Sequence, residues 1–227
     1  MLGARPTGDV DIDFLSLLSD ANRRRVLEGS TKVAYAAGAI AFHPDGPERS
    51  FVLDRGLARA FASVPDGRQA TVTFVHEKEL AGGTAIVSHA PRVLLQVVVD
   101  STVTLLDIDR VRSLMTSENQ VCTALAVHLA ARVRSAFRLI SVRSLGNIRE
   151  RVAYDLLERA CQSQLAVGRL EVRATHSELA DSIGSSREVV SRALRDFRAA
   201  RIVETVPGRV RVIDPVRLAG IVRAYDY

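Results

Sequence analysis

Residues 175–197, which read THSELADSIGSSREVVSRALRDF, are the most informative stretch of this chain. Thr175 and Glu178 match the S/T-x-x-E capping box that starts a helix, and Gly184 permits a tight turn where that helix would end. Either of the next two serines can cap a second helix. The inward face of this second helix is predicted from four apolar residues at helical spacing: Val190, Ala193, Leu194 and Phe197. The stretch therefore predicts two short helices joined by a tight turn.

The outward face of the second predicted helix is rich in arginine. It carries Arg187, Glu188, Ser191, Arg192, Arg195 and Arg198. Arginines on the exposed N-terminal part of the second of two such helices are what a helix-turn-helix needs to enter the major groove of DNA. A solvated arginine face on an ordinary helix is the simpler interpretation. The ordered series of cap, glycine, second cap and following hairpin favours the helix-turn-helix.

The hairpin follows immediately along the chain. Residues 202–205 and 209–213 are β-rich and flank the turn sequence Val206-Pro207-Gly208, a pattern typical of a β-hairpin. Such a hairpin would be the wing of a winged helix, with Arg209 near its tip.

Residues 33–108 have the pattern of an antiparallel β domain. Glycines and turn pairs separate short β-rich runs, among them 51–53, 70–75, 93–99 and 103–108. Many short strands at regular spacing predict a sandwich or a barrel-like roll. Before them, apolar residues between Phe14 and Val26 predict a short helix or two.

Residues 109–143 contain neither proline nor glycine and predict one long amphipathic helix. Its apolar seam recurs at three- and four-residue steps: Cys122, Leu125, Leu129, Val133, Ala136 and Ile140. Such a narrow seam can pack on its twin in a two-stranded coiled coil, or only on its own β domain. We favour the dimer. Beyond the helix, Asn147 can cap another helix over 148–161, with a polar stretch at 162–168 and a β-like run at 170–173.

Composition narrows the function classes. The chain has 227 residues, is 47% hydrophobic and carries a net charge of +5, with the positive charge in its C-terminal half. Lys32 and Lys78 are its only lysines, so its cations are almost all arginine, which suits phosphates and guanine edges or reflects a coding bias. Neither a membrane-spanning stretch nor a signal peptide is apparent, so we expect a cytoplasmic protein without a membrane partner.

The sequence contains no recognisable motif of a catalytic site or of a structural metal site. The sequence has no G-x-S-x-G, H-E-x-x-H, P-loop lysine or G-x-G-x-x-G pattern, so we expect no enzyme. Cys122 and Cys161 are too few for a disulfide framework or a four-cysteine zinc site, and no metal site is expected.

These patterns together resemble the Crp/Fnr family of bacterial transcription regulators over nearly the whole chain. The resemblance implies an α+β fold: an antiparallel β-roll of the cyclic-nucleotide-binding type over 1–108, a dimerisation helix over 109–144 and a winged helix-turn-helix over 145–227. Its specific part is the run from Glu178 through Gly184 to Arg192. It implies a homodimer on double-stranded DNA and allows RNA polymerase as a further partner.

The resemblance also assigns residues to DNA. Arg187 and Arg192 would each bind a guanine, and Glu188 would accept from cytosine amino groups, which implies a TGTGA-like half-site. Ser191 also matches the Fnr branch, which reads a TTGAT-like half-site, and Glu188 could instead form a capping box with Ser185. Phosphate contacts are expected from Thr175, His176, Ser177, Arg195, Arg198 and Arg209.

The residues with which members of the family bind a cyclic nucleotide are matched less closely in this sequence. The corresponding segments read Glu79-Leu80-Ala81-Gly82-Gly83 and Pro91-Arg92-Val93. Arg92 could still bind a phosphate, but the ribose-binding glutamate is missing from its place unless Glu79 reaches in. The implied pocket comprises Arg92, Gly82, Gly83, Ala136 and Phe137.

The effector itself stays open. The departures from these nucleotide-binding residues disfavour control by cyclic AMP, and two cysteines exclude a four-cysteine iron–sulfur cluster. Haem remains an alternative, with His43, His76, His89 and His128 available as axial ligands, as does a regulator that needs no effector. A cyclic-nucleotide or haem sensor acting through protein contacts is the rival function, but it leaves the arginine-rich helix unexplained.

Overall fold

The computed structural model describes residues 12–89 and 91–223. The chain opens with a short 3-10 helix, η1 (Phe14–Leu17), and the helix α1 (Asp20–Leu27), as the sequence predicts. Ser19 caps α1 by accepting a hydrogen bond from the Asn22 backbone N–H. None of the helices in the described ranges is long and apolar enough to cross a lipid bilayer.

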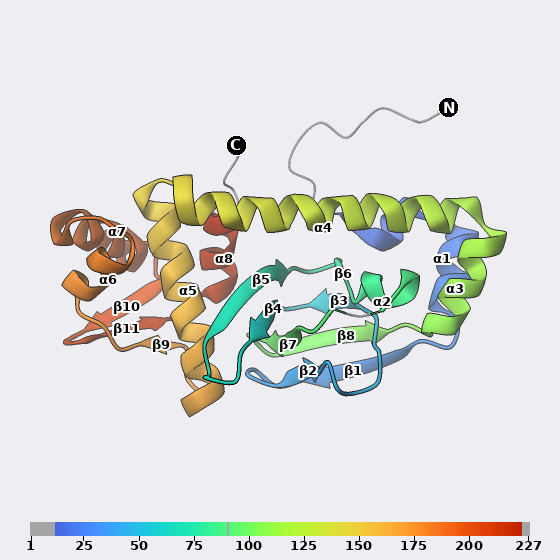
Figure 1. The fold of residues 1–227 in the computed structure, drawn as a ribbon, viewed down its shortest axis with the longest axis horizontal. Helices are drawn as coiled ribbons and strands as arrows, with labels where there is room; N and C mark the ends of the chain where they lie inside the picture. The colour runs from blue at the N-terminus through green and yellow to red at the C-terminus, as the bar shows by residue number, and fades with distance from the viewer. Residues whose placement is uncertain (1–11, 90, 224–227) are drawn as a thin grey trace.

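The predicted β-roll is confirmed as two four-stranded antiparallel sheets packed face to face (Figure 1). One sheet has the strand order β1 (Thr31–Tyr35), β8 (Ser101–Leu105), β3 (Phe51–Arg55) and β6 (Leu80–Ala81). The other has the order β2 (Ile40–Phe42), β7 (Leu94–Val97), β4 (Ala58–Ser63) and β5 (Gln69–Val75). Side chains such as Leu53, Val97 and Val103 fill the space between the sheets and are fully buried.

A short helix, α2 (Gly83–Val87), interrupts the strands between β6 and β7. It starts from Gly82, whose φ of 76° lies in the left-handed region. A Cβ at Gly82 would collide with the carbonyl oxygen of Arg49, so glycine is required there.

The prediction of one unbroken helix over 109–143 is wrong. The structure has two helices, α3 (Ile108–Ser117) and α4 (Asn119–Leu145), with Glu118 extended between them (φ −125°, ψ 97°). The Glu118 carboxylate pairs with Arg25 of α1, and Val111 and Leu114 of α3 are buried in a core shared with α1 and α4. The chain turns because α3 packs back on the N-terminal helices, a long-range contact that no proline or glycine announces.

The C-terminal region begins with α5 (Ile148–Val167), where Asn147 and Glu150 form a capping box. Asn147 is the predicted cap, but the helix continues beyond its predicted end at Cys161 and includes the polar stretch as far as Val167. The stretch is polar although part of it is buried. The Gln164 side chain is buried, donates to the Val98 carbonyl at 2.9 Å and accepts from Gln96 at 2.9 Å.

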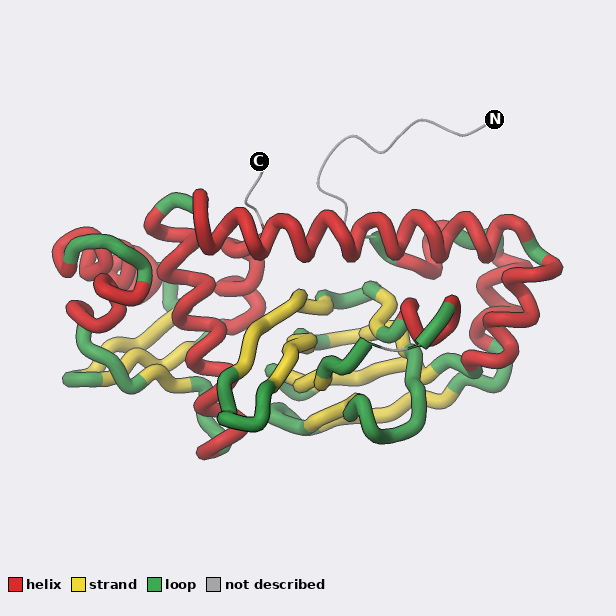
Figure 2. The backbone as a smooth tube through the Cα atoms, in the orientation of Figure 1, coloured by secondary structure: helices red, strands yellow, loops and turns green. Residues whose placement is uncertain are grey.

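The remaining elements form the winged helix-turn-helix. They are β9 (Glu171–Val172), α6 (His176–Ser182), α7 (Arg187–Ala199), β10 (Val203–Val206), β11 (Arg209–Val212) and α8 (Pro215–Arg223). Their core is continuous with the β-roll, because Leu57, Phe74 and Val98 belong to the same buried cluster as Phe197 and Leu218. Figure 2 shows this helix-rich unit at one end of the molecule, with α4 running along the β-roll.

Candidate nucleic-acid interface

The two helices predicted from residues 175–197 are present with their caps. Thr175 and Glu178 form the reciprocal capping box of α6: the Thr175 hydroxyl accepts from the Glu178 N–H at 3.2 Å, and the Glu178 carboxylate accepts from the Thr175 N–H at 2.7 Å. Gly184 (φ 61°) forms the turn, and Ser186 caps α7. All four predicted inward residues of α7 are buried: Val190, Ala193, Leu194 and Phe197.

The arginine face of α7 points to solvent. Arg187, Arg192, Arg195 and Arg198 are exposed, as the helical spacing predicts. Ser191 is only partly exposed, because its hydroxyl lies 2.8 Å from Nδ1 of His176 on α6. Ser191 and His176, two predicted DNA contacts, thus bond to each other between α6 and α7.

Glu188 is exposed at the first turn of α7 and does not form the alternative capping box with Ser185. Its carboxylate accepts hydrogen bonds from its own backbone N–H and from the Ser186 hydroxyl, and these lower the pKa of Glu188. The side chain therefore stays ionised near neutral pH and can accept further hydrogen bonds.

The wing is present as the β10–β11 hairpin, extended by β9 into a three-stranded antiparallel sheet. Pro207 and Gly208 make its two-residue turn, and the φ of 70° at Gly208 is the value that a type II turn requires of its third residue. Arg209 lies beside this tip, with Nη1 3.7 Å from Oε1 of Glu171, so its charge is partly balanced.

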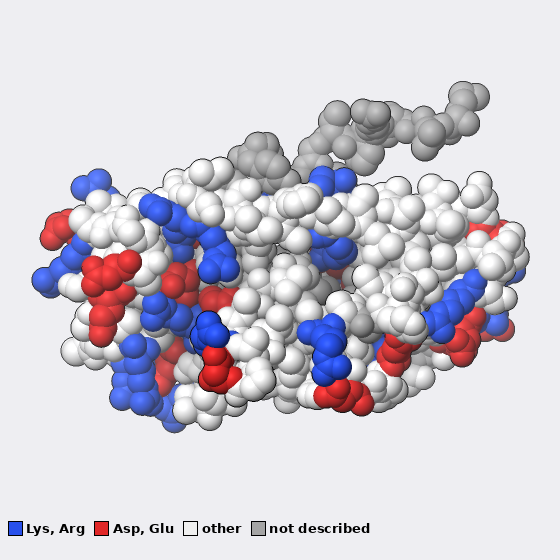
Figure 3. All heavy atoms as spheres, in the orientation of Figure 1, with Lys and Arg blue, Asp and Glu red and all other residues white. Residues whose placement is uncertain are grey.

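A groove joins these parts. A hollow of about 420 Å³ lies between the start of α6, the start of α7 and the wing. Its lining includes Thr175, His176, Ser177, Arg187 and Arg209. Four predicted phosphate contacts and one predicted base reader therefore share one surface. Lys and Arg side chains gather at this end of the molecule in Figure 3, among acidic side chains.

The outer face of α4 is the second surface of interest. No other described element lies outside it in Figures 1 and 2. Val133 is 53% exposed, Phe137 56% and Ile140 62%, and Cys122 is also exposed.

The predicted seam is only partly right. Leu125 is 1% exposed and packs into its own core, and Leu129 and Ala136 are only partly exposed. The prediction is wrong for Leu125 because α4 lies on the β-roll and so has a second apolar face, which points inward.

A cavity of about 210 Å³ lies between the β-roll and α4. The predicted pocket residues Gly82, Gly83 and Ala136 line it. Two predictions fail here. Arg92 has an 81% exposed side chain that pairs with Asp45 at 3.1 Å, and Phe137 points to the outer face of α4. The placement of Arg92 depends on the path of its loop, which residue identity does not specify.

The ionisable side chains that line this cavity are Arg49, His128 and Arg132, and none of them is among the predicted pocket residues. One signal could have found two of them: His128, Arg132 and Ala136 follow each other at four-residue steps and so share a face of α4.

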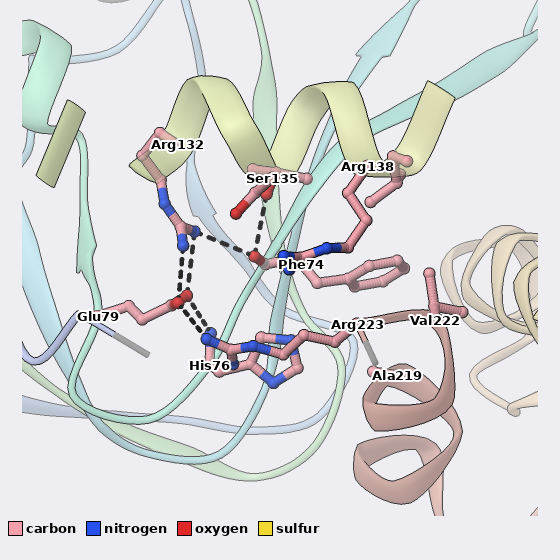
Figure 4. Close-up of a pocket in the computed structure, with 11 residues that line it drawn as sticks. Phe74, His76, Glu79, Arg132, Ser135, Arg138, Ala219, Val222 and Arg223 are labelled. Carbon is pink, nitrogen blue, oxygen red and sulfur yellow. Dashed lines mark hydrogen bonds and ion pairs between the residues drawn. The ribbon is translucent and has the colours of Figure 1, made fainter. Parts of the chain in front are cut away.

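Arg132 also borders a smaller neighbouring cavity (Figure 4). There, Glu79 accepts hydrogen bonds from Arg132 Nη2 at 2.7 Å and from Arg223 of α8 at 2.9 Å, and it does not line the larger cavity. Glu79 is 1% exposed, and burial raises its pKa.

The four candidate haem ligands lie apart. His43 and His89 are exposed, with His43 3.6 Å from Asp45. Burial and nearby Arg132 lower the pKa of His76 to about 4 and that of His128 to about 3. Only His128 lines the 210 Å³ cavity, and a porphyrin is far larger than that space, so these residues do not fit haem. No group of three or more His, Cys, Asp and Glu side chains suited to a metal occurs within the described ranges.

Comparisons with known proteins agree with this geometry. The family model of the Crp-like helix-turn-helix domain matches residues 150–221. The cyclic AMP receptor protein of Thermus thermophilus is 30% identical over 183 residues, which cover 80% of this chain and 83% of that protein. A CRP-like cAMP-activated global transcriptional regulator of Mycobacterium tuberculosis is 26% identical over 192 residues, covering 82% of this chain and 86% of its own.

A solved structure shares the fold. A protein of the crp/fnr family from Eubacterium rectale superposes with a TM-score of 0.58 at 21% identity, covering 94% of this chain and 99% of that one. Together with the winged helix-turn-helix and its exposed arginine face, these similarities show that the chain belongs to the Crp/Fnr family of DNA-binding transcription regulators, which are not enzymes.

Proposed function

We propose that this protein binds, as a homodimer, a two-fold symmetric DNA site with TGTGA-like half-sites. The observation that carries this proposal is the groove between α6, α7 and the wing, which gathers Arg187 with the cationic and hydroxyl side chains suited to phosphates. Arg187 and Arg192 each bind a guanine edge, and Glu188 accepts from cytosine amino groups.

The TGTGA-like half-site is preferred over the TTGAT-like one. Ser191 is the residue that suggested the second half-site, and its hydroxyl already bonds to His176. Arg187 and Arg192 are both exposed, so their guanidinium groups are accessible to base edges. This difference supports reading by the arginines.

The homodimer is supported by the outer face of α4. Val133, Phe137 and Ile140 lie at steps of four and three residues, the repeat of a two-stranded coiled coil. Pairing of two α4 helices covers these exposed apolar side chains and places two α7 helices on one side of the DNA. A pseudo-palindrome with half-sites about 34 Å apart is the matching DNA.

Substitution of the recognition arginines is expected to separate base reading from phosphate contact. Arg192→Ala loses about 1–3 kcal/mol on the palindrome and tolerates more than one base at the position it reads. Arg209→Ala weakens binding to every duplex alike, because it contacts a phosphate, and its partial pairing with Glu171 keeps the loss small. Fluorescence anisotropy on the palindrome and on a scrambled duplex, at several salt concentrations, measures both.

Arg24→Ala is the matched control, since Arg24 is an exposed arginine on α1, at the opposite end of the molecule from α7. It should bind both duplexes like the wild type. An equal loss on both duplexes for Arg192→Ala would refute its role in base reading.

A further inference from the structure

The cavity between the β-roll and α4 is lined mainly by apolar side chains. They come from both sheets, from the loop before β7 and from α4, and include Phe42, Phe51, Val75, Leu80, Leu95 and Leu129. An apolar lining with few polar groups is typical of a site for a small organic molecule. The body of a ligand for this cavity is therefore hydrophobic.

The ionisable side chains that line the cavity are two arginines and one neutral histidine. Arg49 and Arg132 line it, and no Asp or Glu does. The Arg49 guanidinium donates to the Tyr35 hydroxyl at 3.1 Å and has no ion pair within the described residues. His128 is neutral at ordinary pH because burial and Arg132 lower its pKa to about 3. This charge balance favours a ligand with one negative group.

Two buried polar atoms at the cavity wall are unsatisfied. Nε of Arg132 and Nδ1 of His128 have no hydrogen-bond partner among the described residues. An unsatisfied buried polar atom is costly, so a ligand oxygen that pairs with either one after a small side-chain rotation gains binding free energy. Arg132 can do so without leaving Glu79, because both of its hydrogen bonds to that carboxylate use Nη1 and Nη2.

Size restricts the ligand further. An apolar cavity of about 150 Å³ takes up benzene. The cavity here, about 210 Å³, has room for such a ring and a small polar group. A cyclic nucleotide, with its base, ribose and phosphate, is much larger and would also require a partner for its ribose hydroxyl.

We propose that this cavity binds a small apolar carboxylic acid of about the size of benzoate, with its carboxylate between Arg49 and Arg132. The inference rests on the proposed function, since the acid would be the effector of a DNA-binding regulator. Arg132 links the cavity to Glu79, and Glu79 binds Arg223 of α8. A ligand carboxylate that binds Nε of Arg132 therefore bears on a guanidinium that also takes part in a contact between the β-roll and the DNA-binding unit (Figure 4).

Isothermal titration calorimetry of the full chain without DNA tests the ligand class. Benzoate, phenylacetate and hexanoate are each titrated beside the neutral amide of the same shape, and cyclic AMP is titrated separately. At least one acid is expected to bind at one site per chain, at least about tenfold more tightly than its amide, the effect of one charge-assisted hydrogen bond. Cyclic AMP is expected to bind more weakly than that acid.

Arg49→Gln tests the position of the carboxylate. It should weaken binding of the acid at least about tenfold and leave the amide unchanged, while Arg24→Gln on α1 should change neither. Arg49 is preferred to Arg132 for this purpose because Arg132 also holds Glu79. Acids that bind no better than their amides, no heat from any acid, or an acid affinity unaffected by Arg49→Gln would each overturn the proposal.

A parallel anisotropy titration on the palindromic duplex separates the two proposals. A protein that binds the palindrome and takes up no acid refutes the ligand class alone. A protein that takes up the acid and ignores the palindrome refutes the proposed function alone.

Discussion

Phe137→Glu should convert the protein to a monomer and lower its affinity for a palindromic operator more than about 100-fold, or about 2.7 kcal/mol. Phe137 is 56% exposed at the middle of the apolar strip that Val133 and Ile140 continue on α4. In a two-fold dimer each strip packs on its twin, so one substitution buries two carboxylates that have no partner. Sedimentation velocity gives the oligomeric state, and anisotropy gives the operator affinity.

Val64→Glu is the matched control for this substitution. Val64 is 46% exposed in the turn between β4 and β5, where an added carboxylate remains in water. This variant should remain dimeric.

Disulfide cross-linking through Cys122 is a second test of the dimer interface. Cys122 is exposed on the same face of α4 as Phe137, whereas Cys161 is buried. A mild oxidant should link two chains in the wild type and none in Cys122→Ser. A dimeric Phe137→Glu protein with full operator affinity would place the interface elsewhere.

Arg59→Met should lower the free energy of unfolding by about 3–5 kcal/mol. Arg59 is fully buried in β4, and its guanidinium donates to Thr71 Oγ1 at 2.7 Å, to Gln69 at 3.0 Å and to Glu158 of α5 at 2.5 Å. Glu158 is 13% exposed, so removal of the arginine leaves a poorly solvated carboxylate between the β-roll and the DNA-binding unit. Urea unfolding followed by circular dichroism measures the loss.

The double variant Arg59→Met/Glu158→Gln tests the cause. It removes the charge that the single variant leaves without a partner, so it should recover a large part of the lost stability. A double variant as unstable as the single one would show that the loss comes from packing around Arg59 and not from the ion pair.

The winged helix-turn-helix could be predicted from the sequence because its signals are local. The capping box at Thr175, the turn at Gly184 and the inward face ending at Phe197 all lie within a stretch of 23 residues. Each of these features depends on neighbours a few positions away, so hydrogen bonding and helical periodicity specify it without knowledge of the rest of the chain.

The errors arise where distant segments decide the outcome. The long helix breaks at Glu118, where α3 packs back on the N-terminal helices and Glu118 pairs with Arg25. Gln164 is buried within a helix, with its hydrogen-bond partners at the distant Gln96 and Val98. The helix α8 was not predicted at all. Position along the chain suggests Arg92 for the effector pocket, whereas the cations that line it are Arg49, from the loop before β3, and Arg132 of α4.

The spacing of two half-sites tests the central claim most directly. Two α7 helices held by paired α4 helices can enter successive major grooves only when the half-site centres are one helical turn, about 10–10.5 base pairs, apart. We predict that inserting five base pairs between TGTGA-like half-sites lowers the affinity at least about 100-fold, to that of a single half-site, because the second site then faces away. Equal affinity for the two duplexes would contradict a symmetric dimer that reads DNA through α7.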